Sequence, residues 1–105
     1  MDRKEALAEL IAKVEAGDRS ASLRNTPLKG YGGYYEGCLN GSLDAAKALH
    51  EEVLPGWWWK VIDSDPYYVQ VGMLGIGIYA AQSDDPARAW LLAILRALYA
   101  RETDT

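Results

Sequence analysis

The first hydrophobic pattern covers residues 2–16 and has helical spacing. Its apolar positions are Leu7, Leu10, Ile11 and Val14, while most charged residues fall on other faces. This spacing of three and four residues predicts an amphipathic helix. Gly17 follows the last apolar position, and glycine readily adopts the left-handed conformation that ends many helices. We therefore expect the helix to stop there.

Residues 26–41 are rich in glycine and tyrosine and show no regular period. The segment holds Gly30, Gly32, Gly33, Gly37 and Gly41, with Tyr31, Tyr34 and Tyr35 among them. Ordering so many glycines costs backbone entropy. We expect a loop that is either mobile or held against the body by its tyrosines. Loops of this length are often functional.

A second helix is predicted after Ser42, which is a good N-cap residue. The apolar positions Leu43, Ala46, Leu49 and Val53 share one face, and Pro55-Gly56 ends the pattern.

Three alternating segments then predict an antiparallel meander. In residues 57–63, Trp57, Trp59 and Val61 fall on one face, and Trp58, Lys60 and Ile62 fall on the other. Residues 63–66 have turn composition, and residues 67–73 and 74–82 alternate again. Gly75 and Gly77 leave one face of the third segment bare. Such a face allows a helix or a partner to approach closely, and we interpret it as the place where a helix packs.

The last helix is predicted from the start signal Ser83–Pro86 to about Arg101. Its apolar positions Trp90, Leu91, Leu92, Ile94, Leu95 and Leu98 cover more than half of its circumference, so we expect it to be the central core helix. The chain is thus predicted to be an α+β protein with the element order α-α-β-β-β-α. The three-stranded meander packs with the helices in a sandwich of two or three layers.

The composition predicts a single domain and a cytoplasmic location. Half of the 105 residues are apolar and a quarter are charged, which is typical of one globular domain over residues 1–105. Apolar runs are too short for a membrane span, and residues 1–5 do not resemble a secretory signal. Cys38 is the single cysteine, which excludes an internal disulfide but not pairing between chains. We expect a cytoplasmic protein.

The net charge of −4 favours a basic protein partner over direct binding of nucleic acid or anionic lipid. Catalysis by nucleophile and base would have to use Cys38 and His50. His50 is expected to be solvated or to cap its helix near the C-terminal end. Too few ligands cluster for a zinc site. We therefore expect no enzyme activity, no metal and no cofactor.

Two acidic turns contain Asp63 and Asp65, and Asp84 and Asp85. Paired carboxylates can bind calcium or act in acid–base chemistry, but each aspartate is also suited to close a turn or cap a helix. A hydrolase or nuclease would need all four to converge, and we expect the two turns to lie at opposite ends of the sheet.

Aromatic residues give the remaining functional signal. Three tryptophans in a row must alternate faces, so at least one points away from the core. With the tyrosines Tyr31, Tyr34, Tyr35, Tyr67 and Tyr68 they can form a surface for protein recognition. The alternative is that the glycine-tyrosine loop folds over Trp58 and hides it. The candidate partner-binding residues are Tyr31, Tyr34, Tyr35, Glu36, Trp58, Asp63 and Asp65.

Three segments also carry a family resemblance. They are Gly41-Ser42-Leu43-Asp44-Ala45-Ala46-Lys47-Ala48-Leu49, Gly56-Trp57-Trp58-Trp59-Lys60-Val61, and the alanine- and leucine-rich residues 87–98. Together they resemble the phage "ABA sandwich" family of small phage and prophage proteins. The resemblance implies an α-β-α sandwich and a phage origin, and it brings no catalytic residues. This chain departs from the family pattern in residues 30–37, where a special activity could reside.

Two functions are compatible with these observations. The first is a phage interaction protein that binds a host protein, in its most concrete form an inhibitor of a nucleic-acid-targeting defence of the anti-CRISPR type. An acidic patch beside the aromatic residues would favour it. The second is a structural or assembly accessory protein that forms a homodimer through the third strand or the tryptophan face. A flat, apolar, unprotected surface would favour that function.

Overall fold

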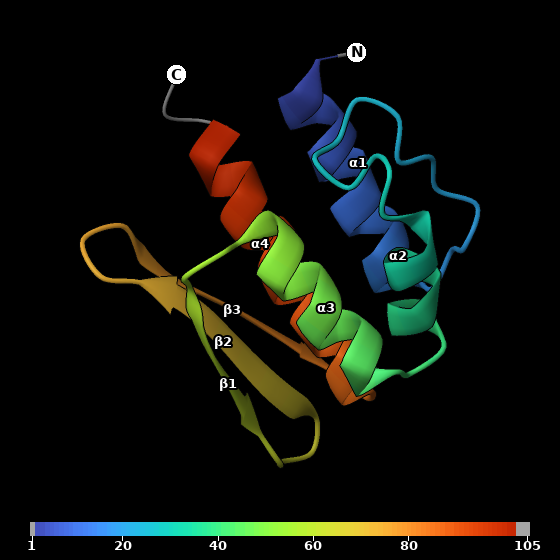
Figure 1. Ribbon diagram of the computed structural model, residues 1–105. Helices are drawn as coiled ribbons and strands as arrows, with labels where there is room; N and C mark the ends of the chain where they lie inside the picture. Colours follow the sequence, from blue (N-terminus) through green and yellow to red (C-terminus); the bar gives the residue numbers. More distant parts are fainter. Residues whose placement is uncertain (1, 103–105) are drawn as a thin grey trace.

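The computed structural model describes residues 2–102, which form four helices and one three-stranded antiparallel sheet (Figure 1). The elements are α1 Arg3–Ala16, α2 Gly32–Leu39, α3 Leu43–Val53, β1 Trp58–Ile62, β2 Tyr67–Met73, β3 Gly77–Ser83 and α4 Pro86–Glu102. The predicted α+β class and the antiparallel meander are confirmed. The order is α-α-α-β-β-β-α, so the predicted order lacked one helix.

That additional helix, α2, lies within the segment predicted to be a loop, residues 26–41. A Cβ atom on Gly37 would lie 2.5 Å from the Cβ of Ala45, so glycine at this position lets α2 and α3 approach closely. Tyr35, Cys38 and Leu39 are buried on the same helix. The prediction of a loop was wrong because this tertiary packing outweighs a helix-propensity cost of about 1 kcal/mol per glycine.

The local start and stop signals are confirmed. Gly17 has φ +76° at the end of α1. The Ser42 hydroxyl accepts a hydrogen bond from the Ala45 amide at 3.1 Å at the start of α3. The Asp85 carboxylate accepts one from the Ala87 amide at 2.9 Å at the start of α4. Each signal acts on neighbouring backbone groups, which is why it can be recognised without the tertiary structure.

Helix α4 forms the middle layer of the molecule. It packs against β2 and β3 on one side and against α1, α2 and α3 on the other, as Figure 1 shows. Its buried residues are Ala87, Ala89, Trp90, Leu91, Leu92, Ala93, Ile94, Leu95, Ala97 and Leu98. The predicted central core helix is therefore confirmed. None of the helices in the described part of the chain is long and apolar enough to cross a membrane.

The strand order is β1-β2-β3, and its register divides the sheet into two faces. Val61 pairs with Val69, and Val69 pairs with Ala81. These three residues therefore lie on the inner face, which α4 covers over β2 and β3. The residues between them point to the opposite side, which we call the outer sheet face. Helices pack on one side of the sheet only within residues 2–102.

The third strand begins later than predicted. Met73–Ile76 form a turn in which the Ile76 amide donates to the Met73 carbonyl at 3.0 Å. Gly75 has φ +84°, the value required at the third position of a type II turn. A Cβ on Gly77 would lie 3.2 Å from the Tyr79 hydroxyl oxygen. The prediction that these glycines provide a helix-packing face was wrong, because they shape the β2–β3 turn.

We expect Leu95→Ala to lower the free energy of unfolding by about 2–5 kcal/mol, because it leaves a cavity in the middle layer. Leu95 is fully buried on α4. The matched control is Leu43→Ala, at a leucine that is 43% exposed, where we expect a change within about 0.5 kcal/mol. Urea unfolding followed by circular dichroism measures both. Equal effects of the two substitutions would contradict the central role of α4.

Candidate protein-binding surfaces

The structure distributes the predicted partner-binding residues over three places, one of which is the β1–β2 turn with Asp63 and Asp65. Tyr31, Tyr34, Tyr35 and Glu36 belong to α2 or precede it, whereas Trp58 begins β1. Figure 1 shows α2 and the sheet in different layers. The side chain of Trp58 is 42% exposed, so the alternative in which the glycine-tyrosine segment hides it is wrong. The tyrosines and Trp58 belong to separate surfaces.

The outer sheet face carries Trp58 in a row with Gly72 and Ile78. A Cβ on Gly72 would lie 2.6 Å from the Trp58 Cε2 atom, which shows that the indole lies directly over this glycine. Ile78 is 61% exposed beside it. The next two rows are Lys60, Gln70 and Ala80, and then Ile62, Tyr68 and Gln82. Of these nine residues, Lys60 alone carries a charge.

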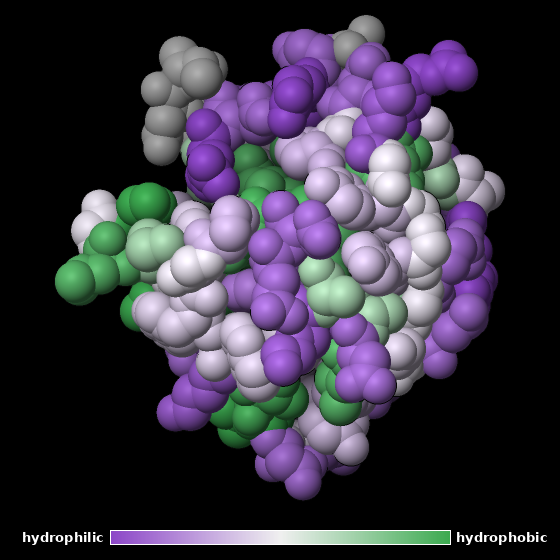
Figure 2. Space-filling model, in the orientation of Figure 1, coloured by the Kyte–Doolittle hydropathy of each residue, from purple (hydrophilic) through white to green (hydrophobic). Residues whose placement is uncertain are grey.

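The β2–β3 turn extends the outer sheet face with exposed aliphatic side chains. Leu74 is 96% exposed and Ile76 is 54% exposed, and we call these two residues the hairpin tip. Residues 71–78 contain no charged side chain. The hairpin projects from the body at the left of Figure 1, and Figure 2 shows a hydrophobic surface there. Sequence reasoning missed this surface because it assigned both residues to a strand.

A second surface lies where the start of α2 meets the end of α3. Gly30, Tyr31, Gly33, Tyr34 and Glu52 line an open groove of about 550 Å³. The two tyrosine rings are nearly parallel, with an angle of 13° and 6.3 Å between their centroids. Tyr34 is 40% exposed. We call this feature the tyrosine groove.

Two predicted residues on α2 have other roles. Tyr35 is buried in the core, and burial raises the pKa of its phenol. Its hydroxyl has no hydrogen-bond partner within residues 2–102. Glu36 lies 3.4 Å from Arg19 in an exposed ion pair. Neither side chain lines the tyrosine groove.

The acidic turns lie at the same end of the sheet, and the prediction of opposite ends was wrong. Tyr67 pairs with Ser83, so the turn that holds Asp63 and Asp65 is beside the start of α4. Asp85 is occupied as the α4 cap. The described residues form no group of three or more metal-ligating side chains that could hold an ion.

His50 is buried, not solvated or capping as predicted. The Trp90 indole N–H donates to His50 Nδ1 at 3.2 Å. Because Nδ1 must then be unprotonated, the proton lies on Nε2, which donates to the Trp57 carbonyl at 3.0 Å. Burial lowers the pKa of His50. The neutral ring thus connects α3, α4 and the entry to β1.

Cys38 is fully buried in α2. Burial raises the pKa of its thiol to about 12, so the thiol stays protonated at neutral pH. A thiolate is the nucleophilic form of cysteine. The same burial opposes a disulfide between chains in the folded state.

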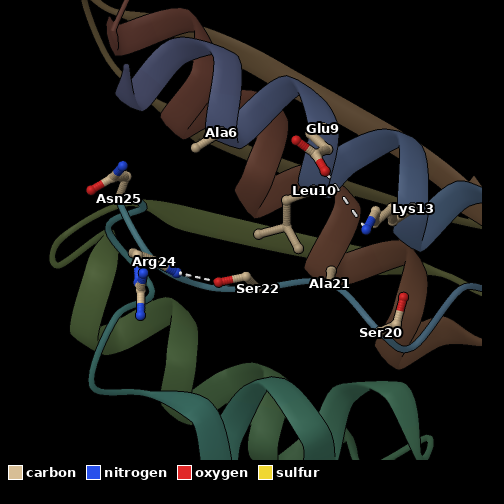
Figure 3. Close-up of a pocket in the computed structure, with 9 residues that line it drawn as sticks. All are labelled: Ala6, Glu9, Leu10, Lys13, Ser20, Ala21, Ser22, Arg24 and Asn25. Carbon is tan, nitrogen blue, oxygen red and sulfur yellow. Dashed lines mark hydrogen bonds and ion pairs between the residues drawn. The ribbon is translucent and has the colours of Figure 1, made fainter. Parts of the chain in front are cut away.

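A smaller pocket of about 260 Å³ lies between α1 and residues 20–25 (Figure 3). Glu9 and Lys13 form an ion pair at 3.6 Å on its α1 side. The Ser22 hydroxyl accepts a hydrogen bond from the Arg24 amide at 3.1 Å. The pocket contains none of the predicted partner-binding residues, and its polar groups of both signs do not favour one ligand class.

Searches against protein-family models, curated proteins and solved structures found no match to this chain. The resemblance to the phage "ABA sandwich" family therefore stays a prediction.

We expect folding stability to fall with acid in a way that depends on His50. Its ordinary pKa is 6.5 and the folded value is lower, so below about pH 6.5 the unfolded chain binds a proton that the folded chain resists. The unfolded state binds more protons there, and stability therefore rises with pH. The contribution of His50 to stability is fully present above pH 6.5 and is lost as the pH falls from 6.5 towards the folded pKa.

The measurement is urea unfolding between pH 5 and 8. The control is His50→Gln, which keeps a donor and an acceptor but does not titrate. We expect the native protein to lose more stability than this variant across that window. Parallel pH profiles would contradict the assignment.

Proposed function

We propose that this chain is a non-catalytic protein-binding protein that inserts its hairpin tip into an apolar groove of another protein. The observation that carries the proposal is the exposure of Leu74, 96%, in a stretch without charges. Trp58 and Ile78 continue the apolar surface along the outer sheet face. Tryptophan is a common anchor residue in protein interfaces.

Burial of this surface would make a measurable contribution to affinity. Burying one leucine side chain stabilises by about 1.5–3 kcal/mol, and a factor of ten in affinity corresponds to about 1.4 kcal/mol. Leu74 alone can therefore change affinity by roughly tenfold to a hundredfold. The two isoleucines and Trp58 add to this term.

A different protein is favoured over a second copy of the chain. The Arg96 guanidinium donates to the Ala80 carbonyl at 2.8 Å and also binds Glu15, so one backbone acceptor in the middle of the edge strand β3 is already satisfied within the chain. Lys60 lies at the centre of β1, which is the other edge strand. A lysine on an edge strand opposes pairing with a strand of another chain. The pockets described at α1 and α2 include charged side chains, which do not suit an aliphatic tip.

The absence of catalysis is part of the proposal. A nucleophile–base pair would have to use Cys38 and His50. The Cys38 thiol stays protonated, and both ring nitrogens of His50 are hydrogen-bonded within the core. These states support a binding role.

The family resemblance supplies the biological setting of the proposal. The partner would be a host protein in the bacterial cytoplasm, and inhibition of a nucleic-acid-targeting defence is the most concrete form. The net charge of −4 supports a partner with basic surface. Assembly with further copies of the chain is the competing function, because the same exposed hairpin tip would also serve it.

We expect Leu74→Asp to weaken partner binding at least tenfold, because a charge cannot be buried in an apolar groove without a large desolvation cost. Leu43→Asp is the matched control, since it makes the same change at an exposed leucine in the first turn of α3. The tagged proteins are used to capture partners from host lysate at low and high salt. The complex is then rebuilt from purified components for calorimetry.

The salt series and a sedimentation run separate the alternatives. Binding through the hairpin tip would persist at high salt, whereas binding through acidic surface would weaken. A partner whose affinity is the same for both variants would contradict the proposal. Recovery of the chain alone, with a Leu74-dependent dimer in sedimentation, would establish self-assembly instead.

A further inference from the structure

The geometry points to the tyrosine groove as a second binding site, which receives an arginine side chain of a partner protein. This site is independent of the hairpin tip, because it lies between helices on the other side of α4 from the sheet (Figure 1). Its ligand class follows from three features. They are two aromatic rings, one carboxylate and an open floor.

The aromatic rings come from Tyr34, which is 40% exposed, and from Tyr31, which packs partly against the core. Their rings are within 13° of parallel, so both present a similar orientation to a planar group. A guanidinium stacks on such rings, and the ring quadrupole attracts its charge. Lysine has the same charge but no plane to stack.

The carboxylate comes from Glu52, in the last turn of α3. Its side chain forms no ion pair within residues 2–102. Glu36, by contrast, pairs with Arg19. The C-terminal end of α3 adds negative partial charge. A carboxylate and a guanidinium can form two parallel hydrogen bonds.

The floor of the groove is open because two of its residues are glycines. A Cβ on Gly30 or Gly33 would meet no atom within 4 Å, so a side chain can approach the backbone there. Tyr31 does not cap α2 through its side chain, and the free amides at that helix end favour an anion. Glu52 opposes an anion at the same place, and the experiment tests both ligands.

The probes are a tetra-arginine peptide, the tetra-citrulline peptide of the same shape without charge, tetra-lysine and inorganic phosphate. Each is titrated into the isotope-labelled full chain, and amide chemical shifts are followed by NMR. We expect tetra-arginine to shift the amides of residues 30–34 and 52. Tetra-citrulline should bind roughly tenfold more weakly, and tetra-lysine about threefold more weakly.

Four variants test the roles of the groove residues. Glu52→Gln and Tyr34→Ala should each weaken tetra-arginine binding about threefold. Glu51→Gln and Tyr68→Ala are the matched controls, at the neighbouring glutamate and at a tyrosine of the outer sheet face, and should leave it unchanged.

Three outcomes would overturn the inference. The first is equal weakening by Glu52→Gln and Glu51→Gln, which would mean general attraction to an acidic protein. The second is a stronger response of residues 30–34 to phosphate than to tetra-arginine, which would assign an anion site. The third is tetra-citrulline binding as tightly as tetra-arginine. None of these results depends on Leu74, so each is distinct from failure of the hairpin proposal.

Discussion

The position of α4 between the sheet and the other helices is the constraint on which the structure depends. Ten of its residues are buried, because the helix has neighbours on both sides. A helix covered in this way must be apolar around most of its circumference. It also covers the inner face of β2 and β3, and the remaining helices pack onto α4 and not onto these strands. This arrangement leaves the outer sheet face open.

The same arrangement explains why His50 is buried. Its ring lies where α3, α4 and the start of β1 meet, and it satisfies the Trp90 indole and the Trp57 carbonyl at once. A buried polar group without such partners costs free energy. The tryptophan-rich entry to the sheet is thus fixed to two helices by one neutral side chain. Trp58, next along the chain, is free to face outward.

The two proposed surfaces differ in chemistry and in location. The hairpin tip is aliphatic and projects on a turn, which suits insertion into a groove. The tyrosine groove is concave and combines aromatic rings with a carboxylate, which suits a cationic side chain. A partner that contacts both would have to reach around the molecule. Each surface can therefore be tested by itself.

The sequence by itself determined the α+β class, the meander, the limits of three helices and the central place of residues 86–102, because periodicity and caps act between near neighbours in the chain. It also placed one tryptophan outward. Only the tertiary structure decided that Gly37 allows a helix against Ala45, that His50 is buried, and that Leu74 lies at an exposed tip. These outcomes depend on contacts between distant segments and on strand register, which no local pattern specifies.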